Sequence, residues 1–293
     1  MISFKCFSFF FAIAVLVFFA GCTGTSPTVP IVDSVTYNGN GNTAGTVPVD
    51  PISPYESGVT VTVFGNTGDL TRINDGGTSY RFTGWNTKAD GSGVDQAEGS
   101  TFVMGVSPVL LYAQWAPYAL RDIGPAGGYI FYDKGYYSKS DFRVVKAAPG
   151  PGPIAPPSDA WRYLEAAPND QSPDAAWGCE GISISGADGT TVGTGEQNTL
   201  DVEAGCTTPD TAADICANLG LGGYNDWFLP SKDELNMMYE NLKVAGVGSL
   251  VDGSYWSSSE LDANDAWRQY FINGNQGYYP KYYELRVRAV RAF

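Results

Sequence analysis

The stretch GGYNDWFLPSKDEL, at residues 222–235, carries the most information about the fold. Ser231 and Glu234 stand three positions apart in front of an apolar run, which is the spacing of a capping box, so a helix is predicted to begin directly after Ser231. The side chains that this helix is expected to bury recur at helical spacing and are Leu235, Met238, Tyr239 and Leu242. An apolar stripe of this kind indicates a packed core rather than a cofactor site.

A second helix is predicted just upstream, over residues 212–219, with Asp210 or Thr211 as its cap. Residues 178–210 are rich in Gly, Thr, Asp and Asn and are predicted to form long surface loops. Short aromatic or alternating runs, typical of strands, lie on both sides at 129–133, 161–167, 255–259, 266–271 and 285–291. In the last run Arg alternates with Val and Ala, which predicts one face in the core and one in water.

An earlier block, residues 33–116, is also rich in strand-like runs, and no long amphipathic helix interrupts it. The runs are bounded by turn clusters and lie at 35–37, 59–64, 80–85 and 109–115. Trp85 and Trp115 are expected to be core anchors rather than ligand platforms, because a module this small needs large aromatic side chains to close its core. The chain is therefore predicted to be α+β and strand-rich, with a second module at 118–293 that holds the two helices.

Composition excludes several classes of function. The 293 residues carry a net charge of −14, with −5 in the first module and −10 in the second, so neither nucleic acid nor another polyanion is an expected partner. Histidine is absent, which excludes Ser–His–Asp triads, Cys–His pairs and His-ligated zinc. We expect a protein that is not an enzyme.

The first residues indicate export. Residues 6–20 form an apolar run too short to span a bilayer comfortably as a helix. Phe19-Ala20-Gly21-Cys22 resembles the lipobox of bacterial lipoproteins, which implies a signal peptide at 1–21 and a lipid on Cys22. An ordinary secretory signal and an uncleaved N-terminal anchor are the alternatives. Residues 22–32 are small and polar and are expected to tether the protein to a membrane of the bacterial envelope, at the outer membrane or the cell surface.

Three cysteines follow the tether, and they are Cys179, Cys206 and Cys216. An exported protein can form disulfides, and three thiols allow at most one bond within the chain. We expect Cys179 to pair with either Cys206 or Cys216.

The motifs VTYNGNG, FTGWNTKADGSG and LLYAQW of the first module resemble the internalin-B-type repeat, also called the Listeria–Bacteroides repeat. The resemblance implies a small β-grasp-type domain that serves as a spacer on bacterial surface proteins. This copy has a longer insert between its first strand and Tyr80.

The second module resembles another family over residues 124–293. Its ordered motifs are GGYIFY, YLEAAPND, AWG, GTGEQNT, GGYNDWFLPSKDEL, YWSSSE and VRAVRAF. They are similar to the C-terminal domain of the Legionella collagen-like adhesin. The resemblance implies a C-type-lectin-like fold of the formylglycine-generating and sulfatase-modifying group, in which the first strand, GGYIFY, pairs with the last, VRAVRAF.

The first functional hypothesis is an adhesin or binding module that presents this head to a host glycan or matrix protein. The candidate ligand-binding residues are Tyr278, Tyr279, Tyr282 and Tyr283, together with Asn273 and Asn275. Clustered tyrosines stack on sugars or anchor protein interfaces, although they can equally be strand residues that pack the core. The adhesin of the resembling family binds sulfated glycosaminoglycans, and a module with a net charge of −10 is poorly suited to such anionic ligands. Arg286, Arg288 and Arg291 either form a basic stripe on the last strand or pair with nearby acids.

The acidic loop between two predicted strands is a candidate calcium site, and no other cofactor is expected. Its oxygen ligands would come from Glu260, Asp262, Asn264 and Asp265, with a simple acidic loop as the alternative. A structural envelope protein without an external ligand is the second functional hypothesis. The third, an oxidoreductase of the formylglycine-generating type, requires a close cysteine pair, and Cys206 and Cys216 lie in no motif of that family.

Overall fold

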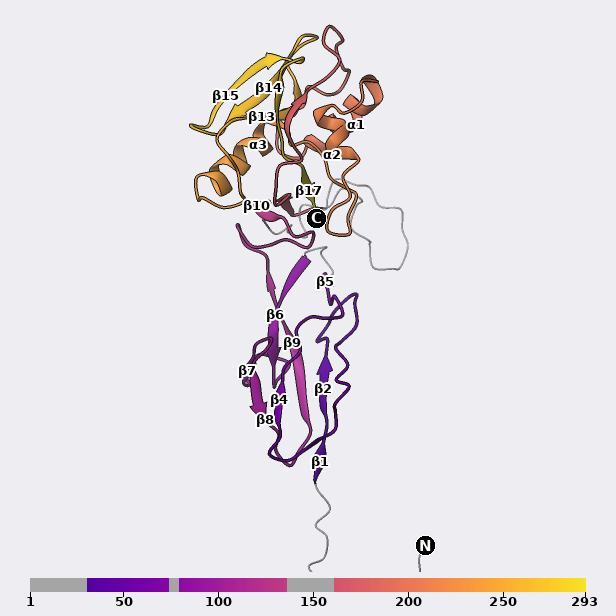
Figure 1. Cartoon of the computed structure of the whole chain (residues 1–293), viewed down its shortest axis with the longest axis vertical. Coiled ribbons are helices and arrows are strands. Elements are labelled where there is room, and N and C mark those ends of the chain that lie inside the picture. The colour runs from indigo at the N-terminus through magenta and orange to yellow at the C-terminus, as the bar shows by residue number, and fades with distance from the viewer. Residues whose placement is uncertain (1–30, 74–78, 136–160) are drawn as a thin grey trace, which may run out of the picture.

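The computed structural model describes residues 31–73, 79–135 and 161–293. The predicted signal peptide, Cys22 and the tether up to residue 30 lie outside the described residues. The described residues up to 117 form a first body, and those from 118 onward form a second body. The two bodies lie end to end along the long axis of the molecule (Figure 1). The fold is α+β and dominated by strands, as predicted. In the described part of the chain, no helix combines the length and the apolar character needed to cross a membrane.

The first body is built of strands. These are β1 (Val32–Asp33), β2 (Val35–Asn38), β3 (Tyr55–Glu56), β4 (Thr60–Thr62), β5 (Arg72–Ile73), β6 (Ser79–Asn86), β7 (Asp95–Gln96), β8 (Thr101–Val103) and β9 (Val109–Pro117). The main sheet has the order β2-β9-β6-β5, with β7 paired to β6. The pairing of β2 with β9 is parallel, and that of β6 with β9 is antiparallel. The long insert before Tyr80 supplies β3, β4 and β5.

Trp85 anchors the core of this first body. Its ring is buried and lies 4.7 Å from the ring of Tyr37, and its indole N–H donates to the Phe64 carbonyl at 2.8 Å. Trp115 is half-buried and donates to the Gly39 carbonyl at 3.1 Å. Both indoles therefore fasten strands to neighbouring loops, which confirms the predicted structural role.

The second body combines two sheets with three α-helices among its described residues. Its strands are β10 (Tyr129–Asp133), β11 (Tyr163–Ala166), β12 (Ser172–Ala176), β13 (Ser254–Glu260), β14 (Asp265–Tyr270), β15 (Asn275–Pro280), β16 (Glu284–Val287) and β17 (Val290–Ala292). Its helices are α1 (Gly195–Gly205), α2 (Ala212–Ala217), α3 (Lys232–Met238) and the π-helical turn η2 (Tyr239–Lys243). The larger sheet has the order β12-β16-β13-β14-β15, and the smaller has the order β10-β11-β17.

The predicted pairing of the first and last strands of this body is wrong. β11 lies between β10 and β17 and pairs antiparallel with both, and all four of its residues are buried. The two ends of the body still meet. The Phe293 carbonyl accepts hydrogen bonds from the backbone of Arg162 and Tyr163, both at 2.9 Å, which fastens the last residue to β11. The Phe293 ring also lies 5.5 Å from that of Tyr118, where the chain enters the body.

The prediction of loops over residues 178–210 is also wrong, since this region contains α1. Val202 is a buried aliphatic side chain of this helix, but the other side chains on the buried face of the helix, Asn198 and Thr199, are polar. Asn198, for example, donates to the Gly189 carbonyl at 2.6 Å. A helix that packs through hydrogen bonds has no apolar stripe, so hydrophobic periodicity does not reveal it.

The other two helices agree with their predictions. Thr211, one of the two expected caps, accepts from the backbone N–H of Asp214 at the start of α2. At α3 the capping box forms: Ser231 accepts from the Glu234 N–H at 3.3 Å, and Glu234 accepts from the Ser231 N–H at 2.7 Å. Glu234 also accepts from Gly193 at 2.7 Å, so it fastens the loop before α1 to the beginning of α3.

Glu234 makes stability depend on pH. Burial raises its pKa from 4.5 to about 7, although its backbone hydrogen bonds act in the opposite direction. Folding therefore takes up a proton between these two values, and the contribution of Glu234 to the free energy of unfolding falls as the pH rises from 5 to 8. The free energy of unfolding, measured in urea across this pH range, should fall with rising pH in the wild type more steeply than in Glu234→Gln. In Asp233→Asn, on the same helix, it should fall with pH as it does in the wild type. A Glu234→Gln curve parallel to that of the wild type would contradict this assignment.

Candidate functional site

Four tyrosines gather on and directly after β15, one of the two edge strands of the larger sheet. Their exposed fractions are 55% for Tyr278, 37% for Tyr279, 58% for Tyr282 and 45% for Tyr283. The alternative in which they pack the core is therefore wrong. Large aromatic side chains that stay exposed in a group are typical of binding surfaces.

The pleat of β15 divides this group. Tyr278 lies opposite Trp267 of β14, and the two rings are 6.1 Å apart. Tyr279 faces the other side of the sheet, where its ring lies 5.3 Å from Tyr283, which in turn stacks on Tyr282 at 4.9 Å. Tyr279, Tyr283 and Tyr282 thus form a continuous series of three rings, here called the tyrosine row.

The charges around the tyrosine row are mixed. The guanidinium carbon of Arg268 lies 4.6 Å from the centre of the Tyr279 ring, which places a cation at one end of the row. At the other end, the Tyr283 hydroxyl raises the pKa of Tyr282, and the charges of Glu180 and Asp265 add to this shift. The negative field beside Tyr282 disfavours an anionic ligand.

The side chain of Lys281 anchors the turn that carries the row. Lys281 is fully buried, and its Nζ donates to Glu260 at 2.5 Å and to the Ile182 carbonyl at 2.8 Å. The same ammonium lies 4.7 Å from the centre of the Trp177 ring. A buried ammonium needs a counter-ion and hydrogen-bond acceptors, and this environment supplies both.

The backbone of Lys281 holds the same turn from two further directions. Its N–H donates to the Asn264 carbonyl at 2.8 Å, and its carbonyl accepts from Trp177 at 3.0 Å. Because Tyr282 and Tyr283 follow immediately, these bonds fix the backbone from which both rings project. The tyrosine row is therefore ordered before any ligand binds, which lowers the entropic cost of binding.

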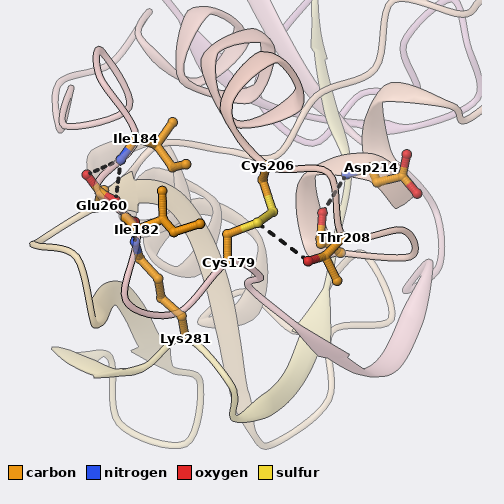
Figure 2. The surroundings of a disulfide bond; sticks show 9 residues. Cys179, Ile182, Ile184, Cys206, Thr208, Asp214, Glu260 and Lys281 are labelled. Carbon is orange, nitrogen blue, oxygen red and sulfur yellow. Dashed lines mark hydrogen bonds and ion pairs between the residues drawn. A yellow bond between two sulfur atoms is a disulfide. The ribbon is translucent and has the colours of Figure 1, made fainter.

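The disulfide joins Cys179 to Cys206, and this resolves the choice that the sequence left open. It ties the loop after β12 to the end of α1, and Figure 2 shows this loop continuing to Ile184, whose N–H donates to Glu260 at 2.8 Å. Cys216 is a buried thiol in α2, and burial raises its pKa. The disulfide and the Lys281–Glu260 pair therefore hold one loop at two points.

The four predicted calcium ligands are not brought together. Glu260 belongs to β13 and is directed inward to Lys281. Asp262 accepts hydrogen bonds from the backbone of Asn264 and Asp265, at 2.8 and 2.9 Å, which lower its pKa and shape a local turn. Across the described ranges, no three or more Asp, Glu, Cys or His side chains are grouped so that they could hold a metal ion.

The basic stripe predicted on the last strand does not exist, and neither does the expected water-facing side. Arg288 is buried and pairs with Asp170 at 2.7 Å. Arg291 is also buried and pairs with Glu165 and Asp226. Arg286, which is partly exposed, pairs with Asp170 as well, at 3.2 Å. The predicted alternative, pairing with nearby acids, is confirmed.

Asn273 and Asn275 lie at the opposite end of β15 from the turn that carries Tyr282 and Tyr283. Asn273 accepts from the N–H of Asn275 at 3.0 Å and thereby shapes the turn between β14 and β15. The structure does not place Asn273 and Asn275 beside Tyr282 and Tyr283.

Sequence reasoning missed Arg268 and Lys281 as parts of this site. Lys281 is the one charged residue between the two Tyr-Tyr pairs of YYPKYY, and this position is a signal that could have revealed it. The charged group of a single lysine inside an aromatic segment must either extend to water or pair with a buried counter-ion.

Three kinds of known protein resemble parts of this chain. The family model of the Lcl C-terminal domain matches residues 170–291, a range that includes the tyrosine row. Two proteins of Evansella cellulosilytica, named "Putative Gly-rich membrane protein" and "Putative membrane protein", are 44% and 43% identical over 81 and 82 residues. Each match covers 28% of this chain but only 8% and 11% of those proteins. A fimbrial protein from Bacteroides ovatus matches in structure with a TM-score of 0.36 and 11% identity, over 89% of this chain and 69% of the other.

Proposed function

We propose that this chain is an adhesin-like binding protein of the bacterial envelope, without enzymatic activity, whose second body presents the tyrosine row to a ligand outside the cell. The observation that carries the proposal is the row itself: three exposed rings in contact one after another, two of them on a turn that Lys281 anchors in the core. The match of residues 170–291 to the Lcl C-terminal domain supports an adhesin-like role.

The proposed ligand is an uncharged glycan of the host. Pyranose rings stack on tyrosine faces, and the hydroxyls of Tyr282 and Tyr283 offer polar contacts at the edge of the same surface. The net charge of −10 on the second body and the acids near Tyr282 act against a sulfated or uronate-rich chain. A matrix protein is the alternative ligand that the experiment below distinguishes.

The proposed location is the cell envelope, with the protein held by a lipid on Cys22. In this arrangement residues 22–32 form the tether, and the first body, as an internalin-B-type spacer, carries the second body away from the membrane. The lipobox-like Phe19-Ala20-Gly21-Cys22 supports the lipid anchor, and the names of the two Evansella proteins, which describe membrane proteins, support only the location in the envelope.

The test is a binding measurement with the full chain, purified in detergent, on an array of glycans and matrix proteins. Tyr282→Ala and Tyr283→Ala should each weaken binding by roughly tenfold or more, because stacking aromatics at the centre of an interface contribute most of its energy. Ile272→Ala is the matched control, since Ile272 is also exposed but lies at the far end of β15. Binding should persist in chelator, because the predicted calcium ligands are not assembled.

The proposal would be supported if the protein binds glycans selectively and Tyr282→Ala abolishes this binding. If the protein instead binds a matrix protein and Tyr282→Ala abolishes that binding, the ligand is a protein rather than a glycan. No binding by folded protein, or binding that both tyrosine variants retain, would overturn it.

A further inference from the structure

The edge of the larger sheet lacks the features that normally prevent sheets from pairing. β15 is the last strand in its sheet, and within the described ranges no strand pairs with its outer side (Figure 1). Residues 275–280 include no charged side chain, and six consecutive pairs join β15 to β14 without a bulge. Natural edge strands are commonly protected by charges, bulges or proline, and here only Pro280, at the end of the strand, serves that purpose.

The register identifies the backbone groups that face outward. The Lys281 N–H donates to Asn264, so the alternation of an antiparallel ladder directs the backbone groups of Asn275, Gly277 and Tyr279 toward β14. The backbone groups of Gln276 and Tyr278 point to the open side, and so does the carbonyl of Pro280, which already accepts one hydrogen bond from the Tyr283 N–H at 3.0 Å. Proline has no N–H, so the outward donors are those of Gln276 and Tyr278.

We propose that β15 pairs antiparallel with β15 of a second copy of this chain, in a register centred on Tyr278. In this register the Tyr278 N–H of each copy donates to the Tyr278 carbonyl of the other. The Gln276 N–H of each copy donates to the Pro280 carbonyl of the other, which accepts this second hydrogen bond beside the one from its own Tyr283 N–H. All four outward donors of the two strands are then satisfied, and the missing N–H of Pro280 leaves no donor without an acceptor.

The side chains fit the same register. The two Tyr278 rings lie opposite each other, and each continues to the Trp267 of its own copy, 6.1 Å away. On the other face Tyr279 of one copy lies opposite Gly277 of the other, where the absence of a side chain leaves space for the ring beside Arg268. Aromatic rings placed across from strand glycines stabilise such pairs.

Self-complementarity favours a second copy over an unrelated extended segment. A two-fold axis through the Tyr278 pair makes the two surfaces identical, as a closed dimer requires. No charged side chain of β15 meets its own kind across the axis, whereas the second bodies as a whole repel each other at −10 each. Dimer formation should therefore strengthen as salt screens this repulsion.

The pairing goes beyond the proposed function and does not depend on it. If both hold, each dimer carries two tyrosine rows, and a ligand with repeated epitopes gains avidity. Tyr278 variants test the dimer and Tyr282 variants test ligand binding, so the two ideas can fail separately.

The first test uses charge at position 278 in the full chain, measured by sedimentation in detergent. The wild type should form dimers, more at high salt than at low salt. Tyr278→Lys and Tyr278→Glu should each weaken dimer formation by roughly tenfold or more, because like charges then face each other across the axis. An equimolar mixture of the two variants should restore the dimer, and Tyr282→Lys is the control that should dimerise like the wild type.

The second test measures the register by disulfide trapping in membranes that contain the full chain. Directly opposed strand residues have Cα atoms about 5.5 Å apart, a distance that a disulfide spans. Tyr278→Cys should cross-link with itself, and Gln276→Cys should cross-link with Pro280→Cys when the two are expressed together. Val244→Cys, which is exposed outside this edge, is the control.

The proposal is overturned if the wild type stays monomeric at every salt concentration, or if Tyr278→Lys alone dimerises as well as the wild type. It is also overturned if Tyr278→Cys cross-links no faster than Val244→Cys.

Discussion

Lys281→Ala should lower the free energy of unfolding by about 3–5 kcal/mol, because it leaves the carboxylate of Glu260 buried without its counter-ion. Glu260 is 6% exposed and its partner ammonium is fully enclosed. The loss should appear in urea unfolding followed by tryptophan fluorescence. Lys243→Ala is the matched control, since Lys243 pairs with an exposed Asp252 and should cost no more than about 1 kcal/mol.

A second variant separates the ion pair from the packing around it. Lys281→Met combined with Glu260→Gln removes both charges and keeps an acceptor for the Ile184 N–H. This double variant should recover most of the stability that Lys281→Ala loses, because neutral groups of similar volume replace a buried pair at small cost. If Lys281→Ala is no more harmful than Lys243→Ala, the buried pair does not anchor the turn as described.

Arg291→Ala should have an effect of similar size, about 3–5 kcal/mol, through a different part of the second body. Arg291 donates to Glu165 at 2.8 Å and to both oxygens of Asp226, at 2.7 and 2.8 Å, and Glu165 is fully buried. Without the guanidinium, Glu165 would have to take up a proton or remain charged inside the protein. The measurement is the same urea unfolding, repeated at pH 5 and pH 8.

Arg286→Ala is the matched control for this prediction, because Arg286 is partly exposed and its pair with Asp170 is longer. Its cost should stay near 1 kcal/mol or below. Arg291→Lys should give an intermediate loss, since an ammonium keeps the charge but cannot reproduce the two-pronged contact with Asp226. Equal stability of Arg291→Ala and Arg286→Ala would show that Glu165 does not depend on Arg291.

Features defined by local sequence patterns were predictable. The capping box of Ser231 and Glu234 and the alternating or aromatic runs that became β6, β13 and β14 agree with the structure, because each depends on neighbours a few residues away. The tyrosines of the candidate site were also identified from their clustering, although not their division between two faces of β15.

Features that depend on distant residues were not predictable. The alternation of Arg in the last strand suggested a face in water, but Asp170, Glu165 and Asp226 come from elsewhere in the chain to cover that face. Glu260 looked like part of an acidic loop because its partner Lys281 lies 21 positions further along the sequence. The spacing of charges along one segment carries no information about which other segment packs against it in the fold.

The meeting of Tyr118 and Phe293 has a consequence for how this body is used in evolution. The chain enters and leaves the second body at one corner, near the junction with the first body, while β15 lies away from that junction (Figure 1). A unit with adjoining ends can be inserted into, or appended to, an unrelated protein without being stretched. Its outer surface then remains free to vary, so the same scaffold can be joined to different neighbouring domains.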